Sequence, residues 1–182
     1  MSNDIEFKRK SAHALFGIAV FACAMIFGTH STLIALLVFS ILAIIAIHVR
    51  IVGKKIFPSL FALERKGVAQ GKGAITLLLG ITAALALGKS MGPTIILVLA
   101  VSDAVATLAG LKGKNNIPWN SHKSLRGCTA FLLTALPICV LTMDPAKGVA
   151  LAIILTLVES LPYCDDNLAI PFAGVAFALL SA

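Results

Sequence analysis

The chain has 182 residues, of which 59% are hydrophobic and only 13% are charged. Its mean hydropathy is +0.99, whereas soluble domains carry about 25% charged residues. A soluble protein of this size cannot bury so much apolar surface, so the composition excludes a soluble fold and indicates a membrane protein. The net charge of +7 does not indicate nucleic-acid binding, because no RNP, zinc-finger or leucine-zipper pattern accompanies it.

The apolar segments predict a single membrane domain over residues 1–182, an all-α bundle of about seven transmembrane helices. Residues 1–11 are polar and basic, and we expect them to form an interfacial segment before the first span. Several spans are at the short end of the roughly 17–25 residues that cross a bilayer. The spans are expected over residues 12–28, 32–49, 73–88, 92–110, 126–142, 147–161 and 168–181.

The connections between these spans are of two kinds. Tight turns are expected at Thr29–Ser31, Gly88–Ser90 and Asp144-Pro145. The longer connections are residues 50–72 and a Gly-rich loop that begins at residue 111. Within the first of these, residues 56–67 are interpreted either as an amphipathic helix on the membrane surface or as a plain connector.

The basic residues predict how the protein lies in the membrane. If successive spans alternate in direction, 13 of the 15 Lys and Arg residues lie on the side of the N-terminus, and only Lys89 and Lys147 lie opposite. Positive residues gather on the cytosolic side of membrane proteins, so we expect a cytosolic N-terminus. The sequence thus indicates a multi-pass integral membrane protein, in the cell (inner) membrane if prokaryotic, with a cytosolic active site.

Carboxylates from three distant parts of the chain are expected at the same depth. Asp103 lies inside the fourth apolar span, where a carboxylate costs about 2.5–3.5 kcal/mol, so it is a candidate functional residue. Glu159 ends the sixth span, and Asp165 and Asp166 precede the seventh. The alternatives are an Asp103 satisfied by neighbouring hydroxyls, a water-facing Glu159, and an ordinary helix N-cap at Asp165–Asn167.

Two predicted helix starts on the cytosolic side carry glycine and basic residues, at Gly71–Gly73 and Lys123–Gly127. Helix N-termini favour anions, glycine permits close backbone approach, and Arg binds two oxygens at once. These segments therefore indicate phosphate binding, although basic residues before a span also follow from topology alone. His13, with Arg9 and Lys10, is expected at the same interface. Trp119 is interpreted as an interface anchor rather than a base-stacking group.

In this order, the residues resemble the polyprenol kinase family, which includes dolichol kinase, phytol kinase and CTP-dependent diacylglycerol kinase. That family is related in pattern to the CDP-diacylglycerol synthases. The resemblance covers nearly the whole chain and departs from the family pattern at Ser102, where glycine is usual. The matching segments are Glu6-x-x-Arg9-Lys10-x-x-His13, Gly71-Lys72-Gly73-Ala74, Asp103-Ala104-x-Ala106-x-x-x-Gly110, Gly113-Lys114, Lys123-Ser124-x-x-Gly127, Glu159 and Asp166-Asn167-Leu168-x-x-Pro171.

The resemblance implies transfer of the terminal phosphate of CTP to a lipid alcohol, either an isoprenoid alcohol or diacylglycerol. It implies that Asp103, Glu159 and Lys123 are catalytic and that Asp103 and Asp166 hold Mg²⁺. The implied nucleotide-binding residues are Lys72, Gly73, Lys114, Ser124, Arg126, Gly127 and Asn167. Arg9, Lys10, His13 and Asp165 are secondary candidates.

Three other functions remain open from the sequence. A cytidylyltransferase would form a CDP-lipid from a phospholipid acid. An ion-coupled transporter would use Asp103 as a relay, but transporters favour internal repeats and charges near the midplane. Here no repeat is evident and the charged residues gather at one face. A non-catalytic membrane scaffold would bind no nucleotide.

Overall fold

The structure is a computed structural model that describes residues 3–51, 69, 71–111, 113, 115–162 and 165–181. The described part is almost entirely helical, which confirms the predicted all-α class. The α-helices of the described residues are α1 (Asn3–Phe27), α2 (Thr29–Ile51), α4 (Lys72–Leu87), α5 (Gly92–Gly110), α6 (Leu125–Thr142), α7 (Pro145–Glu159) and α8 (Asp166–Leu180). A short 3-10 helix, η1 (Lys89–Met91), follows α4 at the turn expected there.

Four segments of the described chain are long and apolar enough to cross a membrane. They are Asp4–Phe27, Thr29–Val49, Lys89–Gly110 and Leu125–Thr142, and α4 and α8 are shorter apolar helices. These lengths support a multi-pass membrane protein. The number of spans and the orientation in the membrane stay predictions.

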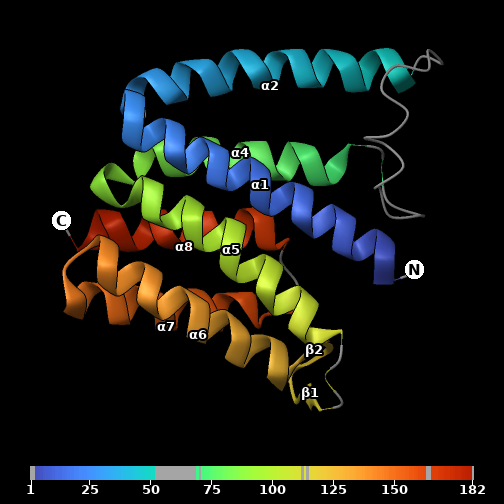
Figure 1. The fold of residues 1–182 in the computed structure, drawn as a ribbon, viewed down its shortest axis with the longest axis vertical. Coiled ribbons are helices and arrows are strands. Elements are labelled where there is room, and N and C mark those ends of the chain that lie inside the picture. The colour runs from blue at the N-terminus through green and yellow to red at the C-terminus, as the bar shows by residue number, and fades with distance from the viewer. Residues whose placement is uncertain are drawn as a thin grey trace.

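Successive helices run in opposite directions (Figure 1). The N-terminus, the start of α6 and the end of α5 therefore lie at one end of the bundle, and the C-terminus lies at the other. We call the first of these the polar end, because its side chains form the site described below. Helix α5 lies in the centre and packs against α1, α6 and α8.

The core explains why α5 is central. Ile95, Ile96 and Val98 of α5 are fully buried, and they belong to one apolar cluster with Phe131 of α6 and Leu155 of α7. Helix α2, by contrast, exposes most of its large apolar side chains on the outer surface of the bundle. An apolar outer surface of this kind suits contact with lipid.

Helices α4 and α8 meet without an intervening side chain at Gly80. A Cβ atom at this position would lie 2.0 Å from the main-chain oxygen of Asn167 and 2.9 Å from the ring of Pro171. Small residues of this kind let two helix backbones approach closely. Gly80 thus fixes the start of α8 against α4.

The N-terminal part differs from the expectation at one turn. The segment expected at the interface, residues 1–11, is continuous with the first helix, because α1 begins at Asn3; its place at the interface stays a prediction. Charge pairs one turn apart support this extension, with Lys8 3.2 Å from Asp4 and Arg9 paired with Glu6. The turn expected at Thr29–Ser31 lies instead at Gly28, whose φ of +85° favours glycine, and Thr29 is helical.

The polar connection after α5 contains a small β-hairpin that the all-α prediction missed. Strand β1 (Asn116–Ile117) pairs antiparallel with β2 (Asn120–Ser124). Pro118 follows Ile117 at the reversal, and proline is favoured at this position of a turn. The hairpin places Lys123 in a strand rather than at a helix start. Residues 56–67, interpreted as an amphipathic helix or a plain connector, lie outside the described residues.

Candidate functional site

The most deeply buried charge at the polar end is Asp103 of α5, which is 0% exposed. Lys10 of α1 forms an ion pair with its Oδ2 atom, and His13 Nε2 lies 3.6 Å from the same oxygen. His13 also lies 3.3 Å from the main-chain oxygen of Leu99. The alternative in which neighbouring hydroxyls satisfy Asp103 is therefore wrong, because a lysine ninety-three residues away holds it.

The other carboxylate oxygen of Asp103 has unmet hydrogen-bonding capacity. Neither Asp103 Oδ1 nor the adjacent Ser102 Oγ has a hydrogen-bond partner among the described residues, although both atoms are buried. Buried polar atoms are nearly always paired, and the exceptions are often found at sites that receive water, an ion or a ligand. Each of these oxygens is thus a candidate contact for a bound group.

A second charged cluster lies beside the hairpin. Lys123 Nζ donates to Glu159 Oε1 at 2.6 Å and to Asp166 Oδ2 at 2.9 Å. The thiol of Cys128 donates to the other Glu159 oxygen at 3.4 Å. Strand β2, helix α7 and helix α8 therefore meet through one lysine. The predicted convergence of Lys123, Glu159 and Asp166 is present in the structure.

The electrostatics of Lys123 and Asp166, which lie outside the predicted spans, link the two clusters. Burial disfavours the charge of Lys123, but Asp166 and Glu159 outweigh this effect and raise the pKa of the ammonium group. Burial raises the pKa of Asp166; Lys123 opposes the rise, and the negative charge of Asp103 adds to it. Asp103 and Asp166 thus influence each other across the polar end.

The residues at the start of α6 serve first as a helix cap. Ser124 Oγ accepts a hydrogen bond from the Gly127 main-chain nitrogen at 3.1 Å, as expected for an N-cap serine. A Cβ atom at Gly113 would lie 2.4 Å from Ser124 Oγ, so the loop closes tightly over this cap. Phosphate binding by Ser124 and Gly127 stays a prediction.

The start of α8 is fixed by Asp165 and Asn167. Asp165 accepts from the Asn167 main-chain nitrogen at 3.1 Å and so caps the helix, which is the structural alternative considered for this residue. Asn167 Nδ2 donates to Thr76 Oγ1 at 3.2 Å and lies 3.3 Å from the Gly73 carbonyl oxygen. Asn167 thus joins α8 to the start of α4, next to Asp166.

The remaining cationic candidates differ in whether their side chains are free to bind an anion. Lys72 and Arg126 are exposed, and neither side chain makes a hydrogen bond or ion pair with any described residue. Arg9 is paired with Glu6 on its own helix. Lys114 lies outside the described residues. Lys72 and Arg126 are therefore the cations best placed to meet an incoming anion.

One positioning residue was missed in the sequence. Asn120 is buried, donates from Nδ2 to the Ser160 main-chain oxygen at 3.0 Å, and accepts from the His122 nitrogen at 3.0 Å. Beside it, Trp119 Nε1 donates to Ser160 Oγ at 3.1 Å, while the indole ring stays half exposed. These bonds fasten the hairpin to the end of α7 and hold Lys123 near Glu159. The turn proline before Asn120 is the only sequence signal for this arrangement.

The residues fit a cation held by few protein ligands. Within the described ranges, no group of three or more His, Cys, Asp and Glu side chains is placed to hold a metal ion. Mg²⁺, however, is commonly bound through one or two carboxylates, phosphate oxygens and water. Asp103, with its partnerless Oδ1 oxygen, and Asp166 are the carboxylates that suit such a site.

Comparison with known proteins gives one informative match. No family model matches the chain, and no solved structure matches it. The chain is 31% identical over 183 residues to the uncharacterized protein MJ1137 of Methanocaldococcus jannaschii. The alignment covers 96% of this chain and 92% of the archaeal protein, so the similarity extends over nearly the full length of both.

Proposed function

We propose that this chain, which belongs to the same family as MJ1137 of Methanocaldococcus jannaschii, is a membrane-embedded lipid-alcohol kinase. It would transfer the terminal phosphate of a nucleoside triphosphate to the hydroxyl group of a lipid. CTP is the donor that the resemblance to the polyprenol kinases implies. The archaeal relative carries no stated activity, so the proposal depends on the site and the motifs.

The observation that carries the proposal is the meeting of acids and lysines from five elements at the polar end. Lys10 and Asp103 come from α1 and α5, and Lys123, Glu159 and Asp166 come from β2, α7 and α8. Phosphoryl transfer needs positive groups to neutralise the phosphates and carboxylates to hold Mg²⁺ and accept a proton. One polar end supplies both.

The proposed reaction is an in-line displacement at phosphorus. The lipid hydroxyl oxygen forms a bond to the terminal phosphorus while the bond to the bridging oxygen breaks, and the nucleoside diphosphate leaves. The hydroxyl proton passes to a carboxylate, for which Asp103 and Glu159 are the candidates. Such catalysis is mainly positioning and charge neutralisation.

The residues of this chain would divide that work. Lys123, Lys72 and Arg126 would neutralise phosphate oxygens. Asp103 and Asp166 would hold Mg²⁺, which when bound supplies positive charge to the terminal phosphates. Lys10 would keep the Asp103 carboxylate in one orientation inside the bundle.

The test uses purified protein in phospholipid vesicles, incubated with CTP labelled in either the α or the γ phosphate. Entry of γ-label into an added isoprenoid alcohol or diacylglycerol supports the kinase. Entry of α-label into lipid indicates the cytidylyltransferase instead. If neither label enters lipid but ions cross the vesicle membrane without nucleotide, the transporter alternative replaces the proposal.

A further inference from the structure

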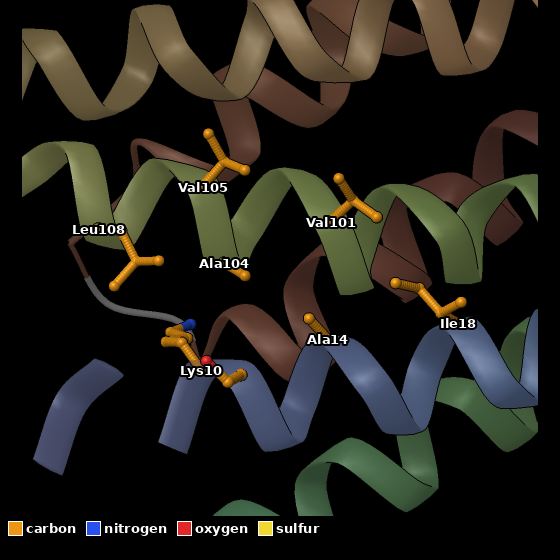
Figure 2. Close-up of a pocket in the computed structure, with 8 residues that line it drawn as sticks. Lys10, Ala14, Ile18, Val101, Ala104, Val105 and Leu108 are labelled. Atoms are coloured by element: carbon orange, nitrogen blue, oxygen red, sulfur yellow. The ribbon is translucent and has the colours of Figure 1, made fainter. Parts of the chain in front are cut away.

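An apolar groove of about 230 Å³ lies between α1 and α5 (Figure 2). Lys10 lies at one end of the groove, near Leu108, and Ile18 lies at the other, near Val101. The two polar residues of the lining are Lys10 and Ser11. The apolar lining consists of Ala14, Ile18, Val101, Ala104, Val105 and Leu108.

The dimensions of the groove suit a single hydrocarbon chain. Lys10 and Ile18 are eight residues apart on α1, which corresponds to about 12 Å along the helix. A volume of about 230 Å³ is below the 300–1,000 Å³ usual for pockets that enclose a drug-sized molecule. Two alanines, Ala14 and Ala104, face the groove from opposite helices, and their short side chains leave the space open.

Lys10 connects this groove to the charged site. Its carbon stem lines the groove, while its ammonium group reaches the Asp103 carboxylate. Long cationic side chains commonly combine an apolar stem with a charged tip in this way. A molecule that lay along the groove with its polar head at Lys10 would bring that head next to the lysine that pairs with Asp103.

We infer that this groove binds the hydrocarbon chain of the lipid alcohol, with the hydroxyl group at the Lys10 end; the inference rests on the proposed function. The polarity of the groove gives the direction, because apolar walls suit the chain and the two polar residues suit the hydroxyl group. Charge supports the same orientation, since the ion pair of Lys10 with Asp103 places charged groups at that end of the groove. Ala14 and Val105 then determine which chains fit.

Photolabelling tests the location directly. The protein in phosphatidylcholine vesicles is irradiated with hexadecanol that carries a diazirine in its chain, and labelled residues are identified by mass spectrometry. We expect label on α1 and α5 at the groove residues. Ala14→Phe and Val105→Phe, from opposite walls, fill the groove, and each should lower this labelling about tenfold, the effect of roughly 1.4 kcal/mol of lost binding.

The matched control is Ala35→Phe, the same substitution on the exposed surface of α2, away from the groove. It should leave the labelling unchanged. In the γ-labelled CTP assay, the ratio of kcat/KM for hexadecanol to kcat/KM for butanol should fall in both groove variants and not in Ala35→Phe. Gel filtration and circular dichroism establish that each variant is folded. If one of the two groove variants does not fold, the other still tests the inference.

The outcomes separate the inference from the proposed function. Label in the groove without phosphate transfer to any lipid alcohol would retain the chain-binding site and reject the kinase. Transfer to hexadecanol with an unchanged chain-length ratio in both groove variants would retain the kinase and overturn the inference. Label spread evenly over all lipid-facing helices would also overturn it.

Discussion

The two lysine–carboxylate clusters of the polar end differ in their access to water. Lys10 and Asp103 have side chains that are 6% and 0% exposed. In the other cluster, Glu159 is similarly buried, but Lys123 and Asp166 are 22% and 25% exposed. The first cluster joins two helices within the bundle, whereas the second lies where strand, loop and helix ends meet.

This difference suggests separate roles for the two clusters. A buried ion pair exchanges partners only at a large cost in free energy. When one charge moves away, the other is left buried with neither a partner nor water to stabilise it. A partly exposed pair is screened by water and exchanges partners more readily. Lys10–Asp103 therefore suits a fixed element of the site, and Lys123 suits a group that turns towards an arriving phosphate.

The largest expected effect is that of Asp103→Asn. Phosphate transfer should fall to the background, and stability should fall by about 3–5 kcal/mol because Lys10 loses its buried partner. The γ-labelled CTP assay and thermal unfolding in detergent measure the two effects. Full activity in this variant would contradict the role assigned to Asp103.

The double variant Lys10→Met with Asp103→Asn separates stability from chemistry. With both charges gone, no unpaired ion remains inside the bundle, and much of the lost stability should return. Transfer should stay at the background. A double variant as unstable as Asp103→Asn alone would show that the ion pair is not the cause of the loss.

Lys123→Met should lower transfer by about 10²–10³-fold, the usual effect of removing one group that stabilises developing charge. Its effect on stability should be smaller than that of Asp103→Asn, because Lys123 and Asp166 are partly hydrated. The control is Lys8→Met, which removes an exposed lysine that is paired with Asp4 at the same end of the bundle. Equal losses of activity in the two variants would contradict a specific role for Lys123.

Arg126→Gln tests the exposed cations. Because Arg126 is exposed and makes no ion pair with any described residue, we expect unchanged thermal stability. The KM for CTP should rise several-fold if the guanidinium group meets a phosphate. A KM equal to that of the wild type would remove Arg126 from the nucleotide site.

The smallest expected effect is on stability at high pH. The folded state raises the pKa of Lys123 above 10.5, so its contribution to stability is complete below that pH. The contribution is lost as the pH rises through the higher, folded-state value. The difference in unfolding temperature between wild type and Lys123→Met should therefore shrink in strong alkali, and a difference that grows would contradict the raised pKa.

Helix α5 shows what the sequence could predict. It was expected over residues 92–110 and spans Gly92–Gly110, because an apolar run is bounded by a proline near its start and glycines at its ends. If successive spans alternate in direction, Lys123, Glu159 and Asp166 come to one end, as they do in the structure. The bounds of the apolar segments carry this information locally.

Other features depend on contacts that no local pattern encodes. The ion pair of Lys10 with Asp103 joins α1 to α5, and neither segment carries a pattern that predicts the contact with the other. Asn120 likewise acquires its role only once the hairpin rests on α7. The hairpin strands are short and lack alternating apolar residues, so the usual strand signal is missing.

Because of the contact at Gly80, the distances between the charged residues of the site depend on how the apolar helices α4 and α8 pack. Because the backbone of α8 rests directly on α4 there, any added side chain would push Asn167 outward. Asp166 precedes Asn167 in the chain and would move away from Lys123 with it. A single methyl group added at Gly80 would thus separate the charged residues of the site without contacting any of them.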